Sequence, residues 1–163
     1  MSSPPSLAFG RDGNAFLLEA SQWLPRPLDE VFPFFADAMN LEALTPPLLR
    51  FHVATPAPIT IAQGTLIDYR LKLRGIPMAW RSEIRVWEPP HRFVDYQVRG
   101  PYLLWHHEHL FSESDGGTLV RDRVHYRVFG GALVERLLVR PDLRRIFAFR
   151  QDFLARYFSH PPG

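Results

Sequence analysis

Residues 64–87, GTLIDYRLKLRGIPMAWRSEIRVW, alternate apolar and polar side chains on either side of an Arg74-Gly75 break. Successive side chains of a β-strand point to opposite faces, so this alternation predicts two strands with one buried and one solvent-facing side. The Arg-Gly break is typical of a turn. We therefore expect an antiparallel hairpin whose inner face carries Thr65, Ile67, Tyr69, Leu71 and Leu73 on one strand and Ile76, Met78, Trp80, Ser82, Ile84 and Val86 on the other.

Further strand-like segments flank this hairpin and are separated by breaks rich in proline or glycine. Breaks at this spacing favour antiparallel hairpins over parallel strands joined by helices. In residues 92–99 the alternation places Val94, Tyr96 and Val98 inward, which leaves Phe93, like Trp87 before it, on the charged face. The expected strands are 14–23, 49–55, 64–73, 76–87, 92–99, 102–111 and 118–128.

Helical segments lie between the first two strands and after the last one. A helix that begins near Pro27 places proline in its first turn and acidic residues near its positive end. A second short helix is expected over residues 40–44, before a pair of prolines. After Gly130-Gly131, apolar residues recur at steps of three and four as far as Tyr157, which predicts an amphipathic helix. Pro141 is expected to kink this helix or divide it.

These elements predict an α+β fold, in which a curved seven-stranded antiparallel sheet buries its apolar face under a long C-terminal helix. Two short helices follow the first strand. We expect a flexible N-terminal arm over residues 1–13, a single domain over residues 14–158 and a short tail over residues 159–163.

The composition is that of an ordinary globular domain: 163 residues, 46% hydrophobic and 22% charged. The absence of cysteine excludes disulfides, thiolate metal sites and a cysteine nucleophile. The sequence has neither a signal-peptide pattern nor an apolar run long enough to span a membrane, so we expect a cytoplasmic protein. Charges of both signs alternate along the chain, and we expect no nucleic-acid partner.

The last helix has a basic face, which we interpret as solvated. Attraction to an anionic membrane surface is a less favoured alternative. The residues of this face are Arg136, Arg140, Arg144, Arg145 and Arg156.

Two histidines of residues 102–111 are expected to point inward. The aromatic ends of the alternating set Trp105, His107, His109 and Phe111 favour this set as the buried one. If Phe111 pairs with Thr118 across the following turn, His107 lies opposite Asp122. A carboxylate beside an imidazole sets its tautomer and raises its basicity.

His107 and Asp122 are therefore the candidate catalytic pair, with His107 as general acid or base. The alternative that we favour is that the two side chains satisfy each other in the wall of a cavity without reacting. His107, His109 and Asp122 also suit a metal ion, but a further firm ligand is not evident, and we expect neither a metal nor a cofactor.

Bulky rings on the inner face predict a cavity for an apolar ligand, since small-molecule pockets are mostly apolar with a few orienting polar groups. Core packing is the alternative for any single ring. Arg150 can reach the cavity mouth and meet a ligand carboxylate there, but a position on the surface is the favoured interpretation. The full set of candidate ligand-binding residues is Phe34, Phe51, Tyr69, Met78, Trp80, Ser82, Tyr96, Trp105, His107, His109, Asp122, Tyr126, Phe147 and Arg150.

Four stretches resemble a known group of bacterial ligand-binding proteins. They are PLDEVFPFFA (27–36), WHHEHLF (105–111), GTLVRDRVHY (117–126) and RRIFAFR (144–150). The group is the START-like (SRPBCC) superfamily, which includes relatives of polyketide cyclases and of the birch-pollen-allergen fold. The resemblance covers residues 14–158 and implies a helix-grip fold, in which the sheet and the C-terminal helix enclose a ligand.

The resemblance implies the fold more strongly than an activity, because such folds host binders, transporters and enzymes alike. The favoured function is binding or carrying a hydrophobic small molecule, such as a lipid, a polyketide or an isoprenoid. The first alternative is a cofactor-independent cyclase or dehydratase that uses His107 and Asp122. The second is an interaction or stress-response module whose cavity is closed by Trp80, Trp105 and Phe147. The sequence does not predict an oligomeric state.

Overall fold

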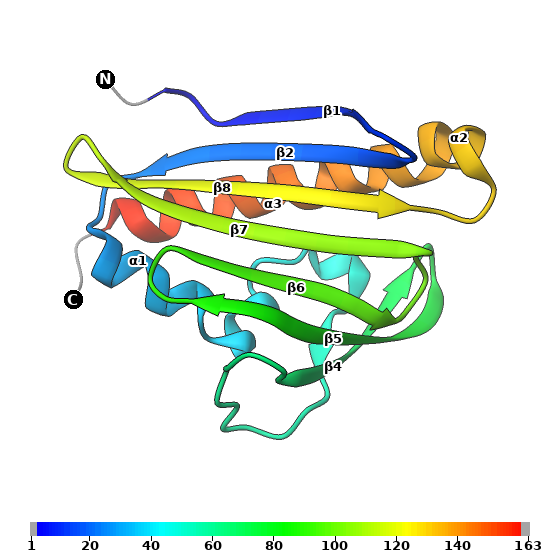
Figure 1. Cartoon of the computed structure of the whole chain (residues 1–163), viewed down its shortest axis with the longest axis horizontal. Helices are drawn as coiled ribbons and strands as arrows, with labels where there is room; N and C mark the ends of the chain where they lie inside the picture. The colour runs from blue at the N-terminus through cyan, green and yellow to red at the C-terminus, as the bar shows by residue number, and fades with distance from the viewer. Residues whose placement is uncertain (1–2, 161–163) are drawn as a thin grey trace.

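The alternating segments pair into one eight-stranded antiparallel sheet in the computed structural model, which describes residues 3–160 (Figure 1). The order of strands across the sheet is β1-β2-β8-β7-β6-β5-β4-β3. The strands are β1 (Ser6–Asp12), β2 (Ala15–Leu24), β3 (His52–Val53), β4 (Leu66–Leu73), β5 (Ile76–Glu88), β6 (Arg92–Arg99), β7 (Leu104–Ser114) and β8 (Gly117–Arg127).

Strand β1 corrects the prediction of a flexible arm over residues 1–13 and adds an eighth strand to the sheet. Ser6–Asp12 pairs with β2 as a hairpin closed by Gly13 and Asn14, and Gly13 has a φ of 60°. Leu7 and Phe9 are partly buried against the core at this edge. The Asp-Gly-Asn turn and these two apolar residues are the signals of the strand. Residues 1–2 of the arm and 161–163 of the tail lie outside the described part of the chain.

Short helices connect β2 to β3, as expected. Helix α1 (Leu28–Phe35) carries Asp29 and Glu30 in its first turn, and the second short helix is a 3₁₀ helix, η1 (Ala38–Leu41), capped by Asp37. A further 3₁₀ turn, η2 (Pro47–Leu49), ends at Arg50 in the left-handed conformation, so of the strand expected over residues 49–55 only His52–Val53 pairs, as β3.

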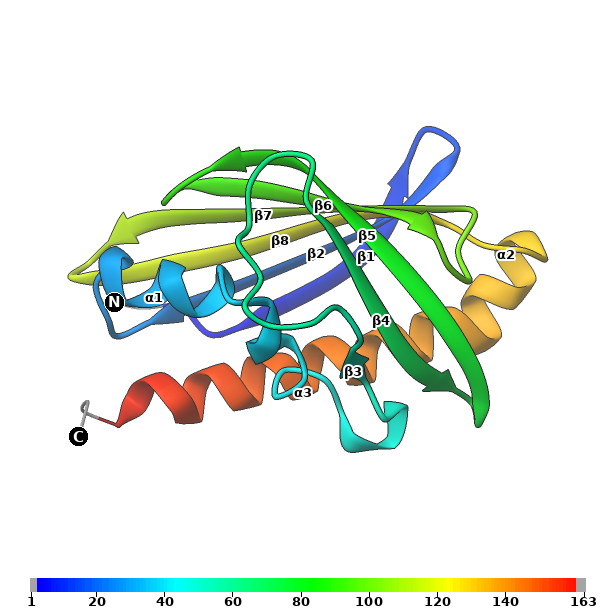
Figure 2. The same cartoon turned by 90° about the horizontal axis from the view of Figure 1, so that it is seen from below.

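The C-terminal helical run consists of α2 (Gly131–Val134), a π-helical turn η3 (Glu135–Val139) and α3 (Arg140–Ser159). The division predicted at Pro141 is present, since α3 begins next to this proline, which has no N–H to donate within a helix. Figure 2 shows α3 running along the inner side of the curved sheet, with α1 at one end. None of the described helices is both long and apolar enough to cross a membrane.

The faces of β4 and β5 follow the predicted alternation near the middle of the hairpin. Ile67, Tyr69, Ser82 and Ile84 are buried on the inner face. On the outer face Asp68 pairs with Arg81 at 2.8 Å.

A register shift between Ile84 and Val86 then reverses the alternation. Trp87 consequently points inward and packs on Phe93 with ring centroids 5.5 Å apart, so the expectation that both lie on the charged face is wrong. A bulge inserts a residue on one strand and is invisible to a strict period of two.

The turn between β7 and β8 is tighter than the one assumed from the sequence. Asp115 and Gly116 both have positive φ, as a two-residue turn of a β-hairpin requires, and Ser114 pairs with Gly117. Phe111 therefore lies opposite Val120 rather than Thr118, and Asp122 lies opposite His109 rather than His107.

A buried carboxylate ties the start of the C-terminal helix to β8. Glu135 is fully buried and accepts hydrogen bonds from the Tyr126 hydroxyl at 2.7 Å and from the Arg140 guanidinium at 2.9 and 2.8 Å. Burial and the neighbouring Glu135 raise the pKa of Tyr126, which therefore stays a hydrogen-bond donor.

We expect Glu135→Ala to lower the free energy of unfolding by about 2–3 kcal/mol, because it leaves the Tyr126 hydroxyl and the Arg140 guanidinium without their shared acceptor. Tyr126→Phe, which leaves the ion pair intact, should lower it by about 1 kcal/mol. Urea unfolding monitored by circular dichroism measures both. Equal stability of the wild type and Glu135→Ala would contradict this role of the carboxylate.

Candidate functional site

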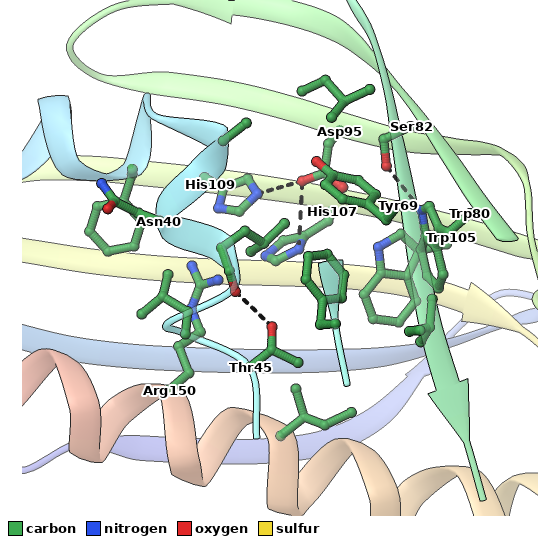
Figure 3. Close-up of a pocket in the computed structure, with 18 of the residues that line it drawn as sticks. Asn40, Thr45, Tyr69, Trp80, Ser82, Asp95, Trp105, His107, His109 and Arg150 are labelled. Atoms are coloured by element: carbon green, nitrogen blue, oxygen red, sulfur yellow. Dashed lines mark hydrogen bonds and ion pairs between the residues drawn. The ribbon is translucent and has the colours of Figure 1, made fainter. Parts of the chain in front are cut away.

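A cavity of about 190 Å³ lies between the inner face of the sheet and α3, closed at one end by the segment from α1 to Phe51. Its walls are mainly aromatic and aliphatic, and Trp80 and Trp105 meet edge to face with ring centroids 5.4 Å apart. Figure 3 shows these rings on one side and a group of polar side chains on the other. The predicted site residues that line the cavity are Phe34, Phe51, Tyr69, Trp80, Ser82, Trp105, His107, His109, Phe147 and Arg150.

Four predicted site residues do not line this cavity. Met78 lies on a separate depression, next to Lys72 and Pro77. Tyr96 is on the outer face, where the Arg85 guanidinium lies 3.4 Å from its ring centroid, because β6 turns Phe93 inward instead. Tyr126 is fully buried and directs its hydroxyl to Glu135. Asp122 is buried behind the two histidines that it contacts.

The polar wall is built by three adjacent strands. His107 and His109 come from β7, Asp122 from β8 and Asp95 from β6. His107 Nε2 lies 2.8 Å from Asp122 Oδ1, and His109 Nε2 lies 2.6 Å from Asp95 Oδ2. The other nitrogens face the opposite acids at longer range, His107 Nδ1 at 3.7 Å from Asp95 and His109 Nδ1 at 3.4 Å from Asp122. Each histidine therefore lies between both carboxylates.

Arg150 joins this wall from the helix. It comes from α3, is 5% exposed, and donates from Nη2 to Asp122 Oδ1 at 3.0 Å. Its Nε atom has no hydrogen-bond partner among the described residues, and its guanidinium lies 5.3 Å from the ring centroid of Phe35. The sequence favoured a surface position for Arg150, with the cavity mouth as the alternative, whereas the structure places it in the cavity wall, paired with Asp122.

The surroundings shift the pKa values of the two histidines in opposite directions. The two rings stack with centroids 3.7 Å apart. Burial lowers the pKa of His107, and the positive charge at His109 lowers it further. Burial also opposes protonation of His109, but contacts with Asp122 and Asp95 outweigh it and raise the pKa of His109. Two imidazolium rings in contact would repel, so these contacts favour a single proton on the pair, held by His109 rather than by His107.

Both acids remain ionised in this environment. Burial opposes the charge on Asp122, but Arg150 and the histidines hold the pKa of Asp122 well below its ordinary value. The histidines likewise lower the pKa of Asp95 against the effect of burial. When one imidazole is protonated, it forms with Arg150 and the two carboxylates a cluster of zero net charge, which is the form that a buried site tolerates.

The contact between His107 and Asp122 was predicted, although it is diagonal rather than directly across the strands. Asp95 was missed, because the apolar alternation of β6 assigned it to the outer face. The position of Asp95 directly opposite His107 follows only from the pairing of β6 with β7. Asn40 and Thr45 also reach the cavity from the connecting segment, and their side chains bond to the carbonyls of Phe34 and Leu41.

Asp95, His107 and His109 can also hold a metal ion. Each offers one ligand atom, and these atoms all lie within 4.8 Å of one another. The arrangement can therefore orient a polar group of a ligand, transfer a proton through an imidazole, or bind a metal.

We expect the two imidazoles to titrate separately, His109 above and His107 below the ordinary histidine pKa of about 6.5. Because the folded-state pKa of His109 is raised, its contribution to stability is present below about pH 6.5 and is lost as the pH rises through the folded-state value. Long-range ¹H–¹⁵N spectra of the imidazoles across pH 4–9 measure both values.

The reverse order of the two values, or two independent titrations near the ordinary value, would contradict the shared-proton arrangement.

The sequence matches the model of one protein family, described as polyketide cyclase / dehydrase and lipid transport, over residues 24–154. No curated protein matches it.

Several solved structures have the same fold. Protein Ms6760 from Mycobacterium smegmatis is 17% identical, with a TM-score of 0.70 and coverage of 96% of this chain and 98% of that chain. CalU16 from Micromonospora echinospora is 20% identical, with a TM-score of 0.63 and coverage of 99% and 88%. The major latex-like protein 151 of Panax ginseng is 11% identical, with a TM-score of 0.66 and coverage of 90% and 99%.

These matches confirm the resemblance noted in the sequence and the helix-grip arrangement of sheet and helix. Because the family model spans most of the chain, the protein belongs to the polyketide cyclase / dehydrase and lipid transport family of START-like (SRPBCC) proteins.

Proposed function

We propose that the protein binds or carries a hydrophobic small molecule, such as a lipid, polyketide or isoprenoid, in the cavity between the sheet and α3. The observation that carries this proposal is an apolar cavity with a single polar wall, which is the form of small-molecule sites in proteins. Membership of a family described by cyclisation, dehydration and lipid transport supports the same chemistry of ligand.

The apolar part of the cavity supplies affinity without selecting a particular functional group. Trp80, Trp105 and Phe147 line the cavity and leave a volume of about 190 Å³ between them and the other walls, which argues against the closed-cavity alternative. An apolar protein cavity of about 150 Å³ holds a benzene ring. A ligand of one or two rings therefore fits inside, and a longer ligand would extend through the mouth.

The polar wall supplies orientation. The Asp95 side chain is 20% exposed, so part of its carboxylate remains open on the side of the wall that His107 and His109 form. Ser82 accepts from Trp80 Nε1 at 3.0 Å and keeps its own hydroxyl hydrogen for another partner. A ligand with a hydroxyl or carbonyl group at one end would place that group here and its apolar body among the rings.

We expect Ala38→Phe to weaken binding of a fluorescent aromatic probe by about 10-fold or more, because Ala38 is buried and lines the cavity, and a larger side chain there fills it. Ala132→Phe, the same change at an exposed position of α2, is the matched control and should leave the affinity unchanged. Quenching of the cavity tryptophans on titration measures binding.

Equal affinity in Ala38→Phe and the wild type, with both folded by circular dichroism, would place the probe outside the cavity and contradict the proposal.

A specific observation favours a second function, a cyclase or dehydratase that transfers protons without a cofactor. His107 has a lowered pKa, lines the cavity and is held by Asp122, as a general base requires, and the neighbouring His109 has a raised pKa. His109 could then return the proton as an acid.

We expect His107→Gln to slow α-deuterium exchange of a bound aromatic β-diketone by about 100-fold if His107 is the base, with affinity for the diketone unchanged. His125→Gln on the outer part of the same sheet should leave the exchange rate at the wild-type value. Proton NMR measures the exchange rate. An equal rate in His107→Gln and the wild type would leave binding as the function.

A cytoplasmic location and the lack of a nucleic-acid partner stay predictions.

A further inference from the structure

We propose that Asp95, His107 and His109 form a binding site for a divalent transition-metal ion in the wall of the cavity. Two imidazoles and one carboxylate are the ligand set that proteins use for zinc and for non-haem iron with open coordination positions.

The pairing of β6 with β7 brings the three ligands to one face. Asp95 lies directly opposite His107, and His109 follows two residues later on the same side of β7. Asp95 Oδ2 is 2.6 Å from His109 Nε2 and 3.7 Å from His107 Nδ1. Ligand atoms about 2.1 Å from a metal lie about 3.0–3.4 Å from one another. Adjustments of about half an ångström therefore suffice for these two separations.

The nitrogens that face away from Asp95 are supported from behind. His107 Nε2 lies 2.8 Å and His109 Nδ1 3.4 Å from Asp122 Oδ1. Metal-bound histidines usually donate their other N–H to a carboxylate or carbonyl, which fixes the tautomer and the ring orientation. Arg150, at 3.0 Å, holds Asp122 in position. His109 Nδ1, buried without a hydrogen-bond partner among the described residues, would gain its partner in Asp122 when Nε2 binds the metal.

Charge favours the same position. Asp95 and Asp122 together carry one negative charge more than Arg150 balances. A divalent cation at the Asp95 side, in place of the histidine proton, offsets this charge and leaves a net charge of +1, which an anionic ligand at an open coordination position would balance. Binding would displace the proton between His109 and Asp95 to solvent. The stacked rings, whose planes differ by 21°, would splay so that both lone pairs converge on the ion. Since His107 and His109 line the cavity, the open coordination positions would face a ligand there.

This inference reverses the expectation from the sequence that no metal binds. That expectation considered Asp122 as the oxygen ligand and lacked a third residue at the front of the site. In the structure Asp95 is the third ligand, on the cavity side of the histidines, and Asp122 contacts both histidines from behind.

The test uses the 163-residue chain without a histidine tag, stripped with a chelator and dialysed against Zn²⁺ or Co²⁺. We expect about one equivalent of bound metal and a Co²⁺ spectrum of a four- or five-coordinate site. Asp95→Asn and His107→Ala should weaken binding by about 100-fold or more, and Asp122→Asn by about 10–100-fold. Zn²⁺ should raise the melting temperature of the wild type and not that of Asp95→Asn.

The matched controls are His106→Ala and His125→Ala, since these histidines lie on the outer face of β7 and β8 with ring centroids 6.1 Å apart. Both should bind metal like the wild type. Metal binding lost in the controls, retained in His107→Ala, or absent from the wild type would overturn the proposal. If a variant does not fold, X-ray absorption of the wild-type Zn²⁺ complex decides: two imidazoles support the site, and a shell of oxygen ligands alone overturns it.

Discussion

The carboxylate of Asp122 is the interaction on which the site depends. An ionised carboxylate in a protein interior loses several kcal/mol of hydration, so it persists only when charged and hydrogen-bonding partners surround it. Asp122 has His107 and His109 on the neighbouring strand and Arg150 on α3. Because Arg150 must reach this carboxylate, the contact also links the helix to the sheet at the height of the cavity. Removing Arg150 would leave this buried charge without its guanidinium partner, and removing either histidine would take away one of its buried imidazole contacts.

The aromatic residues and the polar cluster have different roles in the same cavity. Rings such as Trp80 and Phe147 separate the sheet from the helix and supply apolar surface, whereas the cluster provides polar groups on one wall that can orient a ligand. The cluster places an imidazole with a raised pKa, His109, beside one with a lowered pKa, His107. This combination suits ligand orientation, proton transfer and metal binding. The family to which the chain belongs is described by cyclisation, dehydration and lipid transport.

The sequence predicted the sheet, the short helices and the final helix because each follows a period that side-chain burial imposes. It also predicted the contact of His107 with Asp122, although the assumed register was displaced by the two-residue Asp115-Gly116 turn. Asp95 could not be predicted, because its inward direction depends on how the β-strands pair and on the bulge before Trp87. Neither can be recognised from the alternation of apolar and polar residues within one strand.

The most direct test of the central claim, that this cavity holds an apolar molecule, is native mass spectrometry of freshly purified protein followed by extraction under denaturing conditions. The structure predicts an additional mass on the folded chain that is released as an apolar compound with a polar group at one end, and that returns when stripped protein is incubated with the extract. The bare polypeptide mass, both after purification and after this incubation, would contradict a ligand-binding cavity.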